Sequence, residues 1–208
     1  MTTVLIEPVS EQDDYRFTIQ FPSLHEMTDD EFFEFCQLNR DLRIERTAQG
    51  EIIVMPPTGG ETGNRNAKLT FQLVAWSERD GTGEAFDSST GFMLPNGAER
   101  SPDAAWVSRS RLALLTAEQK QKFIPLCPDF VIELRSPTDR LADLKEKMAE
   151  YIANGARLGW LIDPFEKRVY VYMSGREAES VDGALSISGE PVLSGFSLDL
   201  RQIWVSGF

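Results

Sequence analysis

Two acidic side chains lie in segments that are both predicted to be β-strands, and a basic one follows them. Asp103 begins a short apolar run, and Glu133 lies inside another. Lys147 follows on a predicted helix, while Glu61 lies upstream in a glycine-rich segment. If the fold brings these side chains together, their oxygens form a hard pocket of the kind that binds Mg²⁺. A divalent cation in such a pocket suits hydrolysis of phosphodiester bonds.

Glu133 needs a partner because of where it lies. The segment 130–134, FVIEL, is nearly all apolar, which is typical of a strand at the centre of a sheet. Side chains alternate between the faces of a strand, so Glu133 shares a face with Val131 and Arg135. A buried carboxylate is costly unless something compensates it. A metal ion would do so, and so would a salt bridge to Arg135 or to another basic group.

Asp103 carries a weaker signal on its own. It follows Pro102, which favours an extended backbone and limits strand pairing. We expect one strand over residues 100–107, followed by a polar helical segment over 108–122. An aspartate after a proline more often serves a turn or a cap. Only the combination of acids on two strands points to a site.

The elements that must position these residues form a mixed α/β fold. The order strand, helix, strand over residues 130–172 predicts a mixed central sheet flanked by helices. Alternating residues around a Gln-Gly turn predict an added N-terminal hairpin over 42–55, and short C-terminal strands are expected as well. Thr28 begins a helix with a capping box. A long helix is predicted over 61–79, and its residues that are expected mostly to face inward are Ala67, Leu69, Phe71, Leu73, Val74 and Trp76.

Composition indicates one soluble domain. The chain has 208 residues, of which 41% are hydrophobic and 26% charged, as is ordinary for a globular protein with its own core. No apolar run approaches the roughly 20 residues that cross a bilayer, and no signal-peptide pattern is present. We therefore expect a cytoplasmic protein with no membrane contact and a single domain over 1–208.

Histidine and cysteine chemistry is disfavoured. His25 is the one histidine in the chain, which argues against a histidine base or a Ser-His-Asp triad. Cys36 and Cys127 have no CxxC pairing, so they are expected to be reduced, buried thiols and not zinc ligands.

The charge balance weakens the case for nucleic acid. The chain has 33 acidic and 21 basic residues, a net charge of −12. Lys and Arg contacts to phosphates supply most non-specific affinity for DNA, so that affinity should be low. Most of the acidic excess is expected on the solvated surface.

Several sequence blocks together resemble one known family. They are PPTGGETGNRN at 56–66, SPD at 101–103, FVIELRSPTD at 130–139, KEKMAEYIANG at 145–155 and GWLIDP at 159–164. On these blocks the chain resembles the Uma2-type restriction endonucleases within the PD-(D/E)XK nuclease superfamily. The resemblance implies a restriction-endonuclease-like core over about residues 28–172.

The resemblance also implies roles for individual residues. Asp103 and Glu133 match the acids that hold Mg²⁺ or Mn²⁺, and Glu61 matches an accessory acid. The usual Glu-x-Lys motif would place lysine at position 135, where this chain has Arg135. In the family the lysine has moved to the next helix, which points to Lys147. Helix geometry alone would let Lys145 reach the strand ends equally well.

The implied activity is cleavage of DNA. Lys147 would orient the attacking water or stabilise the transition state, and Arg135 could grip a phosphate oxygen. Cutting both strands needs two sites, so a homodimer suits this activity. Arg135 and the net charge favour an alternative, an inactive nuclease fold that binds DNA or protein as a regulatory module. A third alternative is a structural protein whose acids are paired at the surface.

Overall fold

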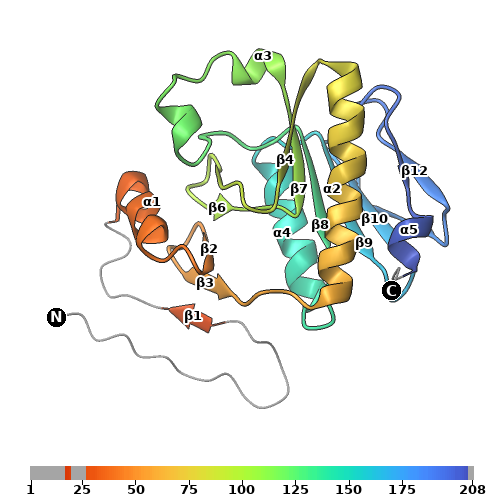
Figure 1. Ribbon diagram of the computed structural model, residues 1–208, viewed down its shortest axis with the longest axis horizontal. Helices are drawn as coiled ribbons and strands as arrows, with labels where there is room; N and C mark the ends of the chain where they lie inside the picture. Colours follow the sequence, from red (N-terminus) through yellow and green to blue (C-terminus); the bar gives the residue numbers. More distant parts are fainter. Residues whose placement is uncertain (1–16, 20–26, 206–208) are drawn as a thin grey trace.

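The computed structural model describes residues 17–19 and 27–205, and its largest element is a six-stranded sheet (Figure 1). The strand order is β11-β10-β9-β8-β7-β4. The strands are β4 (Gly83–Asp87), β7 (Ala104–Ser108), β8 (Phe130–Leu134), β9 (Leu158–Asp163), β10 (Arg168–Met173) and β11 (Glu179–Asp182). His25 lies outside the described residues.

The centre of this sheet is the predicted crossover. β8 runs parallel to β9, and helix α4 (Leu141–Ala153) connects them. The other strand pairs of the sheet are antiparallel. Every residue of β8 is buried. The sheet is therefore mixed, and the prediction of a central strand over 130–134 is confirmed.

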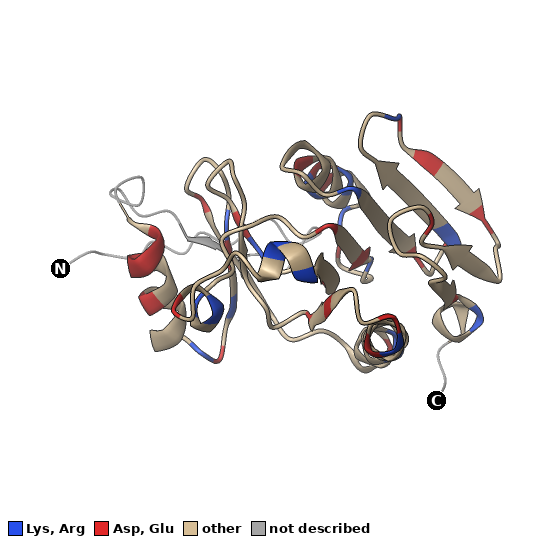
Figure 2. Ribbon diagram, turned by 90° about the horizontal axis from the view of Figure 1, so that it is seen from above, with Lys and Arg blue, Asp and Glu red and all other residues tan. Residues whose placement is uncertain are grey.

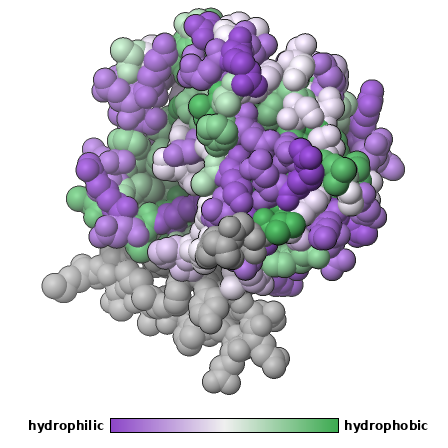
Figure 3. Space-filling view, turned by 45° about the vertical axis from the view of Figure 1, so that its right-hand side comes forward, coloured by the Kyte–Doolittle hydropathy of each residue, from purple (hydrophilic) through white to green (hydrophobic). Residues whose placement is uncertain are grey.

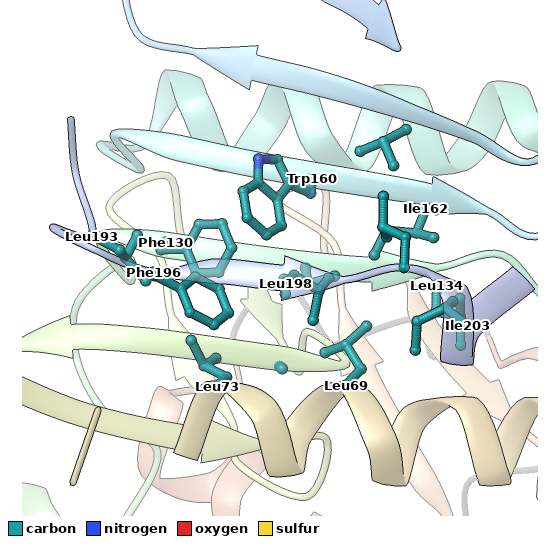
Figure 4. Packing of buried hydrophobic residues seen from close by; sticks show 14 of the residues in the cluster. Leu69, Leu73, Phe130, Leu134, Trp160, Ile162, Leu193, Phe196, Leu198 and Ile203 are labelled. Carbon is teal, nitrogen blue, oxygen red and sulfur yellow. The ribbon is translucent and has the colours of Figure 1, made fainter. Parts of the chain in front are cut away.

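Helices cover both faces of the sheet (Figures 1 and 2). On one face, helix α2 (Gly60–Asp80) packs Leu69 and Leu73 against the core that includes Phe130 of β8 (Figure 4). On the other face, Val131 packs in the cluster to which α4 contributes. The predicted alternation along β8 is thus confirmed, and Glu133 lies on the α4 face.

The inward face of α2 differs from the prediction. Leu69, Leu73 and Trp76 are buried as expected, but Ala67, Phe71 and Val74 are exposed. Phe71 has 72% of its surface exposed. At about 100° per residue, the buried positions are three or four residues apart, and 67, 71 and 74 fall on the opposite side of the helix. Hydrophobic type alone had placed them inward.

A smaller sheet flanks the first one. Its order is β1-β3-β2-β6-β5, and Phe32 of helix α1 (Asp29–Leu38) packs against it. Thr28 caps α1 through the predicted capping box. The strands are β1 (Phe17–Ile19), β2 (Arg43–Arg46), β3 (Ile52–Met55), β5 (Phe92–Met93) and β6 (Glu99–Arg100). β2 and β3 confirm the predicted hairpin.

The single strand expected over 100–107 is in fact two strands in different sheets. β6 ends at Arg100 in the smaller sheet, and β7 begins at Ala104 in the larger one. The segment 101–103 crosses between them, and Pro102 has no N–H with which to continue a ladder. Asp103 therefore lies where the two sheets meet. The helical segment expected over 108–122 is reduced to α3 (Arg109–Leu112) and the short helix η2 (Gln119–Gln121).

The C-terminal segment completes the core on the α2 face. It contains the strand pair β12 (Ser186–Ser188) and β13 (Ser197–Asp199), and helix α5 (Arg201–Trp204). Leu198 and Ile203 join the cluster around α2 (Figure 4). On the face in Figure 3, apolar side chains are interspersed with hydrophilic ones. No helix within the described residues has the length and apolar character to cross a membrane.

Candidate functional site

A cleft of about 920 Å³ opens where the two sheets and α4 meet. The hairpin β2–β3 and the first turn of α2 form part of its wall. The loop 136–139 and the cleft-facing side of α4 form another part. Asp103, Glu133 and Lys147 all line it. The structure therefore brings these three predicted residues into one cavity.

Asp103 is fixed at the junction of the strands. It is 7% exposed, and its Oδ2 accepts a hydrogen bond from the backbone N–H of Leu134 at 2.8 Å. Its Oδ1 accepts one from Asn66 Nδ2 of α2 at 3.2 Å and lies 3.4 Å from Arg43 Nη1 of β2. The bond to Leu134 places the Asp103 carboxylate beside the residue that follows Glu133.

Glu133 has its partners on α4. It is 4% exposed, and its Oε1 accepts a hydrogen bond from the Tyr151 hydroxyl at 3.0 Å. Lys147 Nζ lies 2.9 Å from the same oxygen. Burial raises the pKa of Glu133 to about 7, even though Lys147 opposes the shift, and the nearby carboxylates of Asp103 and Glu45 raise it further.

Lys147 is held between two carboxylates. Its Nζ lies 2.9 Å from Glu133 Oε1 and donates to Glu45 Oε1 of β2, also at 2.9 Å. Burial favours the neutral amine, but these carboxylates outweigh it and raise the pKa of Lys147, so the side chain is an ammonium. The Lys145 ammonium lies instead over the ring of Tyr170, 4.3 Å from its centroid. Of the two candidate lysines, the structure brings Lys147 to Glu133.

Arg135 lies outside this group. Its Nη1 is 2.7 Å from Asp163 Oδ2 at the end of β9. Leu134 pairs with Ile162 in the parallel ladder, so the next residues along the two strands are neighbours as well. The guanidinium is therefore directed to Asp163, and the structure does not bring it to Asp103 and Glu133. The salt bridge to Glu133 that the sequence allowed for Arg135 is made by Lys147.

Glu61 lies on the rim. It lines the cleft, but 58% of its side chain is exposed, and it pairs with Arg65 one turn along α2 at 3.3 Å. It is thus in the same cavity as the buried acids without joining their hydrogen-bond network.

Comparison with known proteins identifies the family. A family model described as "Uma2: Putative restriction endonuclease" matches residues 29–201. The chain belongs to the Uma2 family. No curated protein matches it. A solved structure described as a "putative nuclease belonging to DUF820" from Anabaena variabilis is similar with a TM-score of 0.68 and 22% identity, covering 85% of this chain and 97% of that one. At this identity the likeness shows the fold, which is restriction-endonuclease-like, and the Uma2 match points to a nuclease in general terms.

Two residues of this Uma2 chain were missed by reasoning from the sequence. Arg43 and Glu45 lie on one face of β2 and line the cleft. Arg43 donates to the carbonyl of Ser101 at 2.5 Å and lies beside Asp103. The alternation in 42–46 placed 43 and 45 on a common face. Their partners are 58 and 60 residues away for Arg43 and up to 102 residues away for Glu45, and nothing local indicates them.

The donor set fits a cation that keeps its own waters. Among residues 17–19 and 27–205, no group of three or more Asp, Glu, His or Cys side chains is arranged to hold a metal ion. Two carboxylates face an open cavity. Mg²⁺ usually binds through one or two carboxylates and retains several waters. Asp103 and Glu133 suit this mode, whereas a closed protein cage of the zinc type has no counterpart in the described part of the chain.

Proposed function

We propose that the protein is a metal-dependent nuclease that hydrolyses phosphodiester bonds in DNA. The observation that carries the proposal is that two buried carboxylates, Asp103 and Glu133, share one cleft with the ammonium of Lys147. Membership of the Uma2 family supports it. These residue types suit phosphoryl chemistry, which depends on positioning and on compensation of negative charge.

Asp103 and Glu133 would hold Mg²⁺ or Mn²⁺. The chemistry that such an ion supplies when bound is to lower the pKa of water and to offset charge on the phosphate. Asn66 and the N–H of Leu134 keep the Asp103 carboxylate in one orientation, and the Tyr151 hydroxyl does the same for Glu133. The protein thus presents both carboxylates already ordered, which lowers the entropic cost of binding.

Lys147 would act beside Glu133, on the attacking water or on the phosphate. Its Nζ can donate a hydrogen bond that orients an attacking water, or one to a phosphate oxygen. Such a donor stabilises negative charge as it develops in the transition state. Arg135, directly after β8, is left out of this step because its guanidinium is paired with Asp163 at the end of β9.

The first turn of α2 supports a phosphate-bearing substrate. Its N-cap, Gly59, has no side chain that could cap the helix, and Thr58, Gly59 and Gly60 line the cleft. The free N–H groups and the positive end of the helix dipole favour an anion there.

The surface charge sets how DNA would be held. Along the ribbon, the positions of Lys and Arg are interspersed with those of Asp and Glu (Figure 2). The rim of the cleft carries acids, among them Glu51, Glu61 and Glu146. We expect DNA to bind weakly, through contacts inside the cleft, with an affinity that depends little on salt concentration. A homodimer, which would supply a second site, stays a prediction.

The second candidate function is a nuclease fold that binds but does not cut. The observation that favours it is that both buried carboxylates have resident cations, Lys147 on Glu133 and Arg43 on Asp103. Such pairing satisfies the acids without a metal ion. This candidate predicts DNA or protein binding with no dependence on Mg²⁺ or Mn²⁺.

Cleavage of supercoiled plasmid with Mg²⁺ or Mn²⁺ tests the proposal. We expect nicking by the wild type and its loss in Asp103→Asn and in Glu133→Gln. Glu179→Gln, at an exposed position on β11, is the matched control and should cut normally. Undiminished nicking by either cleft variant would show that the site is elsewhere. Metal-independent binding without nicking by the wild type would favour the second candidate.

A further inference from the structure

Glu45 is a buried acid to which the proposed reaction assigns no role. It lies on β2 in the smaller sheet, is 2% exposed, and lines the cleft. Its Oε1 accepts hydrogen bonds from Lys147 Nζ at 2.9 Å and from the N–H of Ser101 at 3.0 Å. Its Oε2 accepts one from Arg100 Nη1 at 3.2 Å. A carboxylate with this many donors is fixed in place.

We propose that Glu45 is the positioning residue for Lys147: it holds the ammonium against Glu133 from the side of the smaller sheet. The inference rests on the proposed function, in which Lys147 acts on the reacting group. A lysine ammonium sits on a flexible four-carbon stem, so one acceptor leaves it free to rotate. Two acceptors, each 2.9 Å from Nζ, define its place.

The second acceptor matters most when Glu133 is engaged. A carboxylate that binds a cation has less charge to offer a neighbouring ammonium. Glu45 lies on another strand and keeps its own bond to Lys147. It can therefore retain the ammonium beside the reacting group while Glu133 holds the metal ion.

Glu45 is itself braced to the helix that carries the lysine. Arg100 joins Glu45 to Glu150 of α4, with Nε 2.6 Å from Glu150 Oε2. Burial opposes ionisation of Glu45, but Lys147, Arg100 and Arg43 outweigh it and lower its pKa to about 2. Glu45 is thus an anion throughout the neutral range, as an acceptor for Lys147 must be.

Glu99 provides a control for the loss of a buried acid from the same sheet. It is also a glutamate of the smaller sheet, is also 2% exposed, and also lies beside an arginine, with Arg46 Nε at 3.3 Å. It lines a smaller pocket next to α1. Glu99→Gln therefore removes a buried acid from the same sheet without touching the Lys147 network.

The first test needs no metal and no substrate. In protein labelled with ¹⁵N at the lysine Nζ, an ammonium held by two carboxylates exchanges slowly and gives a visible ¹H–¹⁵N signal, which Lys147→Met identifies by its loss. We expect Glu45→Gln to abolish or broaden this signal and Glu99→Gln to retain it. A wild-type signal in Glu45→Gln would overturn the proposal.

The second test is the rate of cleavage. We expect Glu45→Gln to lower kcat on the order of 10- to 100-fold, the usual effect of losing a residue that orients an active-site group, with KM little changed. Glu99→Gln should keep the wild-type kcat. Equal losses in both variants, or a change confined to KM, would mean that Glu45 does not position Lys147.

A Glu45→Gln variant that does not fold and a wild type that cuts no DNA each leave a measurement that decides. If Glu45→Gln does not fold, Glu45→Asp replaces it, because this variant keeps the charge and shortens the side chain by one methylene. A displaced lysine signal together with a lower kcat would support the proposal. Wild-type values of both would overturn it. If the wild type cuts no DNA with either metal, the proposed function fails. The lysine signal then decides separately whether Glu45 holds Lys147.

Discussion

Two ion pairs at the same end of β8 have opposite characters. Glu133 and Arg135 are two residues apart, and each has a charged partner, Lys147 at 2.9 Å and Asp163 at 2.7 Å. Asp163 is fully buried, and its second oxygen accepts hydrogen bonds from the N–H groups of the turn at 165 and 166. Both of its oxygens therefore have partners, one in Arg135 and the other in the turn.

The Glu133–Lys147 pair faces the cleft, whereas neither Arg135 nor Asp163 lines it. Glu133 and Lys147 both line the cleft, and Lys147 has a second carboxylate, Glu45, within hydrogen-bond distance. An ion pair that faces a cavity and shares its cation can exchange partners with a ligand. A pair that fastens a turn cannot do so without loosening the fold. Position relative to the cleft therefore distinguishes the two, although their distances are alike.

The largest effect is expected for Lys147→Met. If Lys147 stabilises charge in the transition state, its loss should lower the rate of plasmid cleavage on the order of 10²- to 10³-fold. Single-turnover kinetics with Mg²⁺ measure this directly, and circular dichroism checks the fold. Cleavage within a few-fold of the wild type would place the chemistry outside the Lys147–Glu133 pair.

Arg135→Met should show the reverse pattern. Removing the cation leaves Asp163 buried without its partner, and such a loss typically costs about 3 kcal/mol in the free energy of unfolding. Urea denaturation measures the cost. At about 20 °C, the cleavage rate of the folded fraction of Arg135→Met should match that of the wild type. A selective loss of activity at normal stability would return Arg135 to the reacting group.

A third buried pair, Arg46 with Glu99, makes the stability of the fold depend on pH. Neither carboxylate oxygen of Glu99 has a hydrogen-bond partner in the described part of the chain, and burial raises its pKa to about 8 although Arg46 opposes the shift. The folded state therefore binds a proton that the unfolded state releases near pH 4.5. The resulting stabilisation is complete below that pH and is lost as the pH rises through about 8.

Glu99→Gln tests that sign. The variant cannot ionise at this position, so its free energy of unfolding should fall less between pH 5 and pH 8 than that of the wild type. Urea denaturation at both values measures the difference. Parallel changes in the two proteins would show that Glu99 is ionised in the folded state throughout this range.

The smallest effect is expected at Glu61. Its carboxylate is more than half exposed and pairs with Arg65 on the same helix, an interaction worth about 0.3–0.5 kcal/mol. Glu61→Gln should leave the free energy of unfolding within that margin and change the cleavage rate less than Glu133→Gln does. A loss of cleavage as large as that of Glu133→Gln would make Glu61 an accessory metal ligand.

Local patterns predicted the elements that local physics determines. The capping box at Thr28, the hairpin around residues 42–55 and the apolar strand at 130–134 each depend on neighbours in the chain, and all are confirmed. The break at 101–103 was missed because it depends on two sheets meeting. The outward position of Phe71 was missed because residue type was weighed above helical phase.

The site was predicted in part. The approach of Asp103, Glu133 and Lys147 to one another agrees with the family resemblance. The partners Arg43, Glu45 and Asp163 were not predicted, because each is selected by strand pairing and docking and not by a sequence motif. The functional roles of the residues in the cleft stay predictions.

The span of these contacts along the chain has a consequence for folding. Glu45 and Lys147 are 102 residues apart, and Arg43 and Asp103 are 60 apart. Contacts between residues so distant in sequence form slowly, because a large loop must close before they are made. Helix α4 and the hairpin can each form early, but the lysine reaches both of its acceptors only after the smaller sheet has docked. A chain that has been synthesised only as far as residue 140 contains Glu45 and Glu133 but not Lys147, so it lacks the assembled site.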